Sequence, residues 1–226
     1  MGKMSVVEEL INPPEKVSSK HDLSQFLCGE PALDDWLRRR ALQNEESGAS
    51  RTYVVCMENR VVGYYALAVG AVAHAEAPGR IRRNMPDSIP VMVIGRLAVD
   101  QTAQGQALGS ALLRDAVLRT VQAAEIAGIR AILVHAISER AKRFYERWGF
   151  IASPVEPMTL MITVTEARKA LQEGRSKLKS ETKRDRRGKA RNDRGCEVAP
   201  ATCTPGISAR AGPEGRVPAN WESLLN

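Results

Sequence analysis

The sequence predicts a single α/β (α+β) domain in which helices flank a mixed central β-sheet. Segments with helical and strand-like hydrophobic spacing alternate along residues 31–164, and a chain of 226 residues has room for one sizeable domain but hardly for two. Near residue 170 the composition changes, and apolar residues become scarce. We therefore expect a folded domain over 1–169 and a basic, Gly/Pro-rich disordered tail over 170–226.

The first predicted elements are a helix and a β-hairpin. Apolar residues recur at helical spacing over 31–48, and Gly48 suits the end of that helix. Residues 52–72 are rich in β-branched and aromatic side chains on both sides of Glu58 and Asn59. This pattern predicts two antiparallel strands joined by a turn.

The middle of the chain is predicted to supply a strand, a long helix and a second strand. A polar insert over 74–88 precedes an apolar strand over 89–99. Helical spacing then runs over 107–127, where Gly128 closes the helix, and residues 131–137 have the composition of a buried strand.

The last predicted elements are a short helix and a hairpin. Ser138 can cap a helix that stops at Gly149. Residues 150–155 and 159–164 then read as two paired strands. The complete order of elements indicates a mixed sheet rather than a purely antiparallel one.

The positive charge is concentrated toward the C-terminus. The formal net charge is +7, and residues 166–195 carry 12 Lys/Arg against 5 Asp/Glu, whereas residues 1–165 carry 19 against 18. A solvated tail without function and an electrostatic arm for nucleic acid both fit this distribution.

Cysteine usage and hydropathy indicate a cytoplasmic protein that does not contact a membrane. Cys28, Cys56, Cys196 and Cys203 form no CxxC pair and have no histidine at metal-ligand spacing, so we expect free thiols and no metal site. The N-terminus lacks the apolar core of a signal peptide, and the most apolar run, 61–75, is shorter than the roughly 20 residues that span a bilayer.

The segment QGQALGS, residues 104–110, follows a strand and opens a helix, where backbone amides can hold a phosphate. A Walker-type loop would need a lysine after Gly109, and a dinucleotide fingerprint would need a second glycine that this segment lacks. The third candidate is the pyrophosphate loop of acyl-coenzyme A transferases, which Gln104, Ala107 and Gly109 approach in spacing.

Several blocks around this loop resemble one family. VMVIGRLAVDQTAQGQALGSALLRDAV, the strand AILVHAI and the helix ERAKRFYERWGF resemble motifs A and B of GNAT acetyltransferases. Residues 28–55, 82–100 and 157–163 are similar to the GNAT-type toxins of bacterial toxin–antitoxin pairs. The resemblance covers about residues 5–165, and the tail has no counterpart in it.

The resemblance implies an activity and partners. The expected reaction is acetyl-CoA-dependent N-acetylation of the amino group of aminoacyl-tRNA, which inhibits translation. The expected partner is a small ribbon-helix-helix antitoxin, with operator DNA reached only through the antitoxin complex, and a homodimer is a further expectation. Acetylation of a protein or small-molecule amine stays open, as does a catalytically weak GNAT scaffold that acts as a binding protein.

The resemblance also implies which residues hold acetyl-CoA. The strand at 96–99 is expected to part from its neighbour and to offer backbone groups to the pantetheine arm. The residues expected to bind the cofactor are Leu97, Ala98, Val99, Gln104, Gly105, Gln106, Ala107, Leu108, Gly109, Ser110 and Ser138. Alanine still supplies an amide at position 107, and a positive φ there would cost about 1 kcal/mol. For Ser138, a plain helix cap is the competing interpretation.

Tyr145 is the candidate catalytic residue, as an acid that protonates the departing coenzyme A thiolate. A tyrosine has an unperturbed pKa of about 10 and therefore stays protonated at neutral pH. Taken alone, a tyrosine beside Phe144 on a helix is more often a core residue. For His135, within an apolar strand, a satisfied or partly exposed histidine is favoured over a base.

Four basic residues are candidates for binding tRNA: Arg82, Arg83, Arg38 and Lys142. Arginine binds phosphate through its planar, two-pronged guanidinium. Arg38 to Arg40 lie about 100° apart on a helix, so at most two of them can share a surface. A solvated face is the competing interpretation for these side chains.

Overall fold

The computed structural model describes residues 12–173. In chain order its elements are β1 (Glu15–Lys16), α1 (Pro31–Arg39), α2 (Ala41–Ser47), β2 (Arg51–Met57), β3 (Arg60–Val72), α3 (Gly79–Arg82), β4 (Ile89–Val99), the 3-10 turn η1 (Gln101–Ala103), α4 (Leu108–Ala123), β5 (Ala131–His135), α5 (Glu139–Arg147), β6 (Ile151–Ala152) and β7 (Thr159–Thr163). Residues 164–173 are helical as well. The predicted disordered tail lies outside the described residues from 174 onward.

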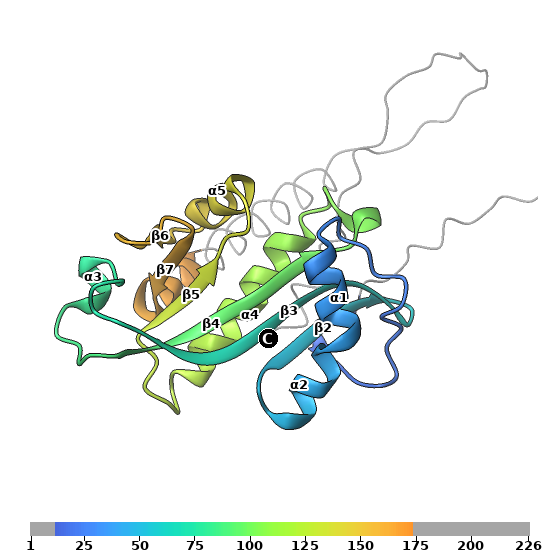
Figure 1. The fold of residues 1–226 in the computed structure, drawn as a ribbon, viewed down its shortest axis with the longest axis horizontal. Coiled ribbons are helices and arrows are strands. Elements are labelled where there is room, and N and C mark those ends of the chain that lie inside the picture. The colour runs from blue at the N-terminus through green and yellow to red at the C-terminus, as the bar shows by residue number, and fades with distance from the viewer. Residues whose placement is uncertain (1–11, 174–226) are drawn as a thin grey trace, which may run out of the picture.

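The strands form one sheet in the order β1-β2-β3-β4-β5-β7-β6 (Figure 1). The β4–β5 pair is parallel, and the other five neighbouring pairs are antiparallel. This mixed sheet flanked by helices confirms the predicted fold class. The division into domains at residue 169 stays a prediction.

The two faces of the sheet are covered differently. The face toward α4 and α5 carries the largest apolar cluster, which includes Leu112, Ile132 and Tyr145. On the opposite face, α1 packs with Tyr64, and the insert that contains α3 packs as a separate cluster at the other end of the sheet. In Figure 1 no described helix crosses the part of this second face that lies between α1 and α3.

The predicted first helix is wrong in one respect, because it consists of two helices. Arg40, with φ −123° and ψ −28°, leaves the helical conformation between α1 and α2. The change of direction lets Glu45 of α2 accept a hydrogen bond from the amide of Thr52 at 2.7 Å and pair with Arg51 at 3.1 Å. The second helix therefore ends against the start of β2, and Gly48 ends it at φ 77° as predicted.

The long helix α4 is shorter than predicted, since it ends at Ala123 and Gly128 lies beyond it. Ile126 is 93% exposed, so the turn after Ala123 does not pack its apolar side chain against the domain. Without such packing a helix end is only marginally stable. Two short elements, β1 and α3, were not predicted, and they are two and four residues long.

Candidate active site

The strand β4 is paired on both sides only in its first half. Its ladder with β5 runs from Val91 to Ile94, opposite residues 131–134. Its ladder with β3 continues to Val99. The edge of residues 95–99 that faces β5 is therefore open, and the two strands part after Ile94 as the resemblance implied.

Two of the three strand residues predicted to contact the cofactor present polar groups to this open edge. The amide of Asp100 donates to the carbonyl of Val62 at 2.9 Å, which makes Gly63 and Val99 a non-hydrogen-bonded pair of the β3–β4 ladder. The N–H and C=O of Val99 therefore point to the open edge. Those of Leu97, two residues earlier, point the same way.

The third residue, Ala98, is placed differently. Its backbone groups face β3, and its side chain is 5% exposed within the cluster beneath α1. The structure therefore does not bring polar groups of Ala98 to the open edge.

The loop after β4 has backbone dihedrals that few residues other than glycine adopt. Gly105 has φ 81°, and Ala107, the N-cap of α4, has φ 60° and ψ 5°. Within residues 12–173 the backbone amides of five consecutive residues donate no hydrogen bond: Gly105, Gln106, Ala107, Leu108 and Gly109. Such amides at a helix N-terminus form an anion site, and the pyrophosphate of acetyl-CoA fits this donor set.

The amide of Ser110 and the side chain of Gln104 are already used within the protein. The Ser110 amide donates to the carbonyl of Ala107 at 2.9 Å. The side-chain amide of Gln104 donates to the carbonyls of Val99 at 3.0 Å and Cys28 at 2.9 Å. Gln104 thus ties the loop to the end of β4 and to the segment before α1.

Asp100, which the sequence analysis missed, fixes the start of the loop. Its carboxylate is 1% exposed and accepts from the amides of Leu27 and Thr102, from the Thr102 hydroxyl, and from Arg60 at 3.1 Å. Burial opposes its ionisation, but these hydrogen bonds and the Arg60 charge outweigh burial and lower the pKa of Asp100. An aspartate two residues before a threonine, directly after a strand, was the available signal.

Tyr145 packs into the same apolar cluster that the side chains of Leu97 and Val99 contact. Its ring lies against Phe144 and Phe150, with centroids 5.2 and 5.7 Å away. Among the described residues its hydroxyl has no hydrogen-bond partner, and the oxygen still reaches solvent. Burial raises the pKa of Tyr145 to about 12. The group is thus a protonated donor that has no acceptor among the described residues.

Ser138 serves as the N-cap of α5. Its hydroxyl accepts a hydrogen bond from the amide of Ala141 at 3.2 Å. The helix-cap interpretation is therefore confirmed, and contact with the cofactor stays a prediction for this exposed residue.

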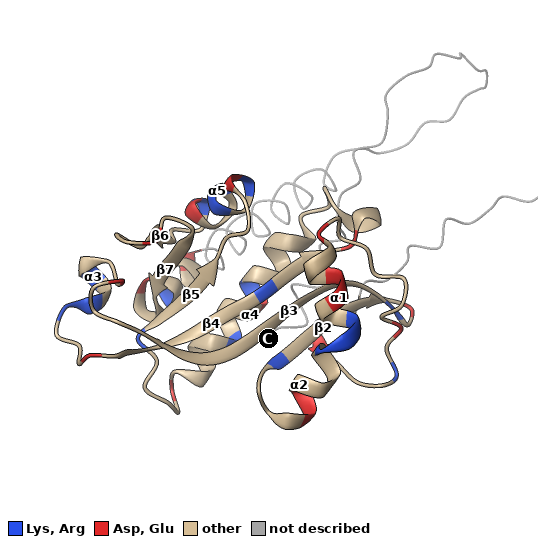
Figure 2. Cartoon of the chain, in the orientation of Figure 1, with Lys and Arg blue, Asp and Glu red and all other residues tan. Residues whose placement is uncertain are grey.

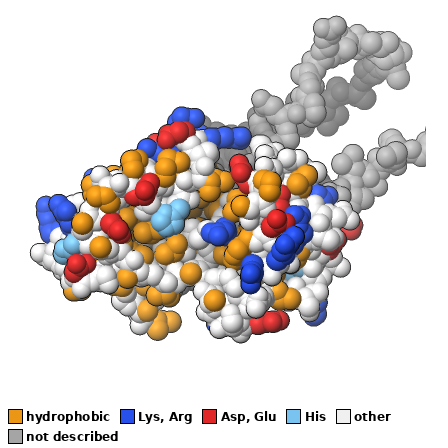
Figure 3. Space-filling view, viewed as in Figure 1, with side chains coloured by type: hydrophobic (Ala, Val, Ile, Leu, Met, Phe, Trp, Pro, Cys, Tyr) orange, Lys and Arg blue, Asp and Glu red, His pale blue; other side chains and the backbone are white. Residues whose placement is uncertain are grey.

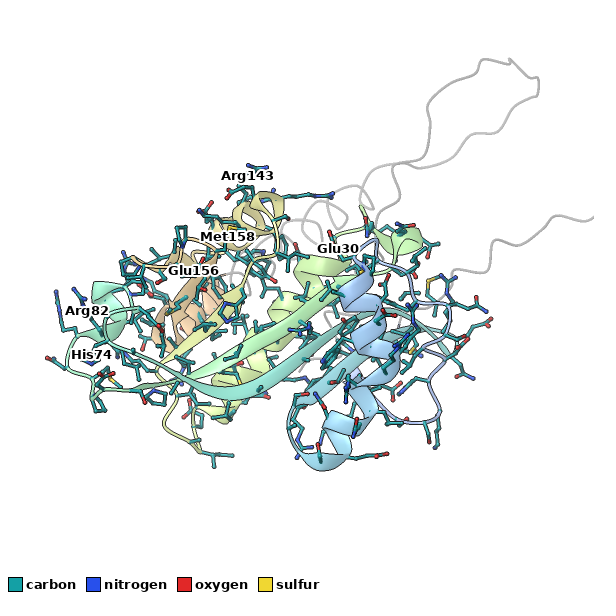
Figure 4. All side chains as sticks on the ribbon, in the orientation of Figure 1. Glu30, His74, Arg82, Arg143, Glu156 and Met158 are labelled. Carbon is teal, nitrogen blue, oxygen red and sulfur yellow. The ribbon has the colours of Figure 1, made fainter. Side chains whose placement is uncertain are left out.

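The basic residues predicted to bind tRNA do not form one patch. Arg82 and Arg83 are exposed at the end of α3, and Arg38 lies on α1 at the other end of the sheet (Figures 1 and 2). Lys142 is half-buried on α5. Figure 4 shows Arg82 on α3, and Arg143 extending outward from α5.

These arginines also differ in how far they are engaged within the protein. Arg38 donates to the carbonyl of Phe26 at 3.0 Å and pairs with Asp35 at 3.1 Å. The side chains of Arg82 and Arg83 have no partner within residues 12–173. The α3 pair is therefore the freer of the two groups.

The insert that carries Arg82 and Arg83 is held to the rest of the domain by hydrogen bonds. The guanidinium of Arg130 donates to the carbonyls of Arg80 and Ile81, both at 3.1 Å. Arg80 itself pairs with Glu166 at 2.8 Å. These contacts hold α3 in place against the rest of the domain.

The face that contains α1 and α3 is shown in Figure 3. Lys and Arg side chains lie on the right of this face, in the region of α1, and over α3 at the far left. Between them lie mainly hydrophobic side chains, together with a further basic side chain and a histidine. Over residues 12–173 no group of His, Cys, Asp and Glu is arranged to hold a metal ion. No helix of that same part is long and apolar enough to cross a membrane.

Comparison with known proteins agrees with this geometry. The Acetyltransferase (GNAT) domain family matches residues 48–152. A Mycobacterium tuberculosis protein named tRNA-acetylating toxin is 55% identical over 155 residues, which cover 69% of this chain and 93% of that protein.

Two solved structures share the fold. AtaT complexed with acetyl-methionyl-tRNAfMet is 29% identical with a TM-score of 0.65, and the match covers 69% of this chain and 96% of that one. An AtaT mutant bound to the C-terminus of the antitoxin AtaR and acetyl-CoA is 26% identical with a TM-score of 0.61, covering 71% and 97%. The family match and the 55% identical relative show that the chain belongs to the GNAT acetyltransferase family.

Proposed function

We propose that this protein is a toxin that transfers the acetyl group of acetyl-CoA to the amino group of aminoacyl-tRNA, and that an antitoxin neutralises it. The observation that carries the proposal is the open edge of β4, which leads directly into the five free amides at the start of α4. The names of the relatives supply the substrate and partner classes, tRNA and an antitoxin.

The open edge and the loop are the parts that would hold acetyl-CoA. Leu97 offers its main-chain N–H and C=O groups along the edge to the pantetheine amides, and Val99 offers its N–H, since the Val99 carbonyl already accepts from Gln104. The amides from Gly105 to Gly109 would hold the pyrophosphate. When bound, acetyl-CoA supplies the acetyl group as a thioester. Ala107 already has the left-handed conformation that the loop needs. This argues against the alternative in which alanine at this position makes the protein a catalytically weak scaffold.

Tyr145 would supply the proton that the leaving sulfur requires. Its hydroxyl is unpartnered among the described residues, and its pKa of about 12 keeps it protonated at neutral pH. The neighbouring rings of Phe144 and Phe150 hold the Tyr145 ring in place. Because the sulfur becomes negative as its bond to the acetyl carbon breaks, a neutral O–H donor beside it lowers the barrier.

Basic side chains on both sides of the site would bind the tRNA backbone. Arg82 and Arg83 are the principal candidates, because they are exposed and free of internal partners. Arg38 and Lys142 are the secondary candidates. The cytoplasmic location, the homodimer and the ribbon-helix-helix class of the antitoxin, with its operator contacts, stay predictions.

The test is transfer of labelled acetyl to a set of charged tRNAs, compared with free amino acids and a lysine peptide. We expect acetylation of charged tRNA, with an affinity that falls steeply as salt rises. The double variant R82E/R83E should bind tRNA more weakly. The slope of its logarithmic binding constant against the logarithm of the salt concentration should be shallower, by about one unit for each phosphate that the variant no longer neutralises.

The matched control is Arg168→Glu, which reverses an exposed arginine that pairs with Glu125. It should leave tRNA affinity close to that of the wild type. Equal rates on the lysine peptide, with no response to salt, would instead support acetylation of another amine.

A further inference from the structure

His135 stands at the point where β4 and β5 part. It is the last residue of β5, directly after the last pair of the parallel ladder, Ile94 and Val134. The corresponding next residue of β4 is Gly95, and a Cβ built there would meet nothing within 4 Å. The histidine therefore borders open space at the fork between the two strands.

The imidazole lies on the opposite side of the sheet from Tyr145. Along β5, Ile132 and Val134 belong to the cluster that contains Tyr145, whereas Leu133 belongs to the cluster beneath the insert. Side chains alternate along a strand, so His135 points to the same side as Leu133. This is the face between α1 and α3, which carries the exposed arginines Arg38 and Arg82.

One ring nitrogen is fixed and the other is free. Nδ1 of His135 lies 2.9 Å from the hydroxyl of Thr159, its direct neighbour across the β5–β7 ladder. Thr159 is 6% exposed, and its amide donates to the carbonyl of Glu156. The side chain of His135 is exposed, and within residues 12–173 its Nε2 has no partner.

The end of β5 that carries His135 is also held in place. The amide of Ala136, the next residue, donates to the carbonyl of Met158 at 2.8 Å. Figure 4 labels Met158 and Glu156 at this end of the sheet. The ring is thus held from one side and presents an unpaired nitrogen to the other.

We propose that His135 receives the proton of the substrate amine, so that acid and base act from opposite faces of the fork. The inference rests on the proposed function and names the base for it. The amine nitrogen forms its bond to the acetyl carbon, and the bond between that carbon and sulfur breaks. One amine proton passes to Nε2 of His135, and the Tyr145 proton passes to sulfur. The histidine returns its proton to solvent, and water reprotonates the tyrosine.

The test measures steady-state kinetics with charged tRNA for His135→Ala and His135→Gln, with and without added imidazole. We expect kcat to fall about 100-fold in both variants, because glutamine can form hydrogen bonds but cannot take up a proton. Imidazole in solution should restore part of the rate of the alanine variant. Acetyl-CoA binding measured by calorimetry, and the melting temperature, should stay at wild-type values.

Thr159→Val adds a measure of the ring's orientation. It keeps the imidazole but removes its hydroxyl partner, so we expect a loss of kcat smaller than that of His135→Ala and no response to imidazole. The matched control is His21→Gln, a half-buried histidine beside Glu15 in the N-terminal segment, which should have wild-type kinetics.

Four results would overturn the inference. An unchanged kcat in His135→Ala would remove the role, and so would a loss that imidazole does not restore. Loss of acetyl-CoA binding in step with activity would show a structural effect instead. A wild-type protein that binds acetyl-CoA but acetylates no charged tRNA would overturn the proposed function and this inference with it. The wild-type measurement thereby distinguishes failure of the proposed function from failure of this inference.

Discussion

The two halves of β4 differ in what folding leaves unpaired. Residues 91–94 have a strand on each side, and their side chains pack into two apolar clusters. Residues 95–99 have a strand on one side only, and the free amides of the next loop follow them. Because a buried backbone group must find a partner, a strand edge that stays open is available for a ligand. The backbone groups proposed to bind acetyl-CoA therefore begin where the pairing of β4 with β5 ends.

The same contrast separates polar side chains that support the fold from those that support the reaction. Asp115 of α4 is 1% exposed and is fully engaged, accepting from the Tyr65 hydroxyl and from Arg119 at 2.9 Å. Arg119 also donates to the carbonyl of Pro14 and lies 3.9 Å from the centre of the Tyr53 ring. Tyr145, at the open half, has no such partner among the described residues.

The largest effect is expected from Tyr145→Phe, which removes the unpartnered hydroxyl alone. The ring keeps its packing against Phe144 and Phe150, so the fold and acetyl-CoA binding should persist. Loss of a general acid should lower kcat about 100- to 10,000-fold. Single-turnover acetylation of charged tRNA measures the change.

The matched control for this variant is Tyr53→Phe. It also removes a hydroxyl that has no partner among residues 12–173, but the Tyr53 ring stacks on Tyr65 at 5.2 Å, away from the fork. Its turnover should match that of the wild type. If both variants kept full activity, the open half of β4 would not hold the proton donor.

The next largest effect is expected from Arg119→Met, which removes the cation from the hydrogen-bonded group of Asp115, Tyr65 and Arg119. It leaves the buried Asp115 charge without its cation, so the free energy of unfolding should fall by about 3 kcal/mol. Denaturation by urea measures the loss. Activity per folded molecule should change little, because the network contacts neither the open edge nor the loop.

The exposed ion pair of Arg168 and Glu125 provides the comparison for that measurement. Arg168→Met should cost less than about 0.5 kcal/mol, because solvent screens exposed pairs. A loss of turnover in Arg119→Met comparable with that of Tyr145→Phe, in protein that remains folded, would show that the two regions are not separate.

Local patterns predicted most of the elements. The turn at Glu58, the cap at Ser138 and the helix stop at Gly149 are set by neighbouring residues, and the structure has all three. The break at Arg40 and the early end of α4 depend on what the helices pack against, which spacing alone does not specify.

The candidate site was predictable where a motif carried it and not where distant segments meet. The loop and Tyr145 came from the resemblance. The bond from the Leu27 amide to Asp100 joins residues 73 positions apart, and the Gln104 bond to Cys28 spans 76. Contacts of this kind arise from the packing of α1 beside the loop, so no local pattern indicates them.

A smaller effect is expected from alkaline pH. Burial raises the pKa of Tyr145 to about 12, whereas an unfolded tyrosine ionises near pH 10. Between these values the unfolded state loses a proton that the folded state keeps, so stability falls as pH rises. Tyr145→Phe removes this contribution and should lose less stability than the wild type between pH 8 and about 11, by on the order of 1 kcal/mol.

Other buried tyrosines also contribute to the loss of stability at alkaline pH, in both the wild type and the variant. Burial also raises the pKa values of Tyr64 and Tyr65, so both proteins should lose stability in the same pH range. An identical loss in the two proteins would mean that the Tyr145 hydroxyl is well solvated in the folded state.

The smallest effect is expected from Ala107→Gly. Alanine at φ 60° costs roughly 1 kcal/mol, which glycine would relieve, while the greater freedom of glycine in the unfolded chain offsets part of the gain. Unfolding free energy should therefore rise by less than about 1 kcal/mol. Since the loop already has the conformation that leaves its amides free, acetyl-CoA affinity measured by calorimetry should stay within about threefold, a change of less than about 1 kcal/mol. A tenfold gain would mean that the free protein holds this loop in another conformation, and that binding has to reorganise it.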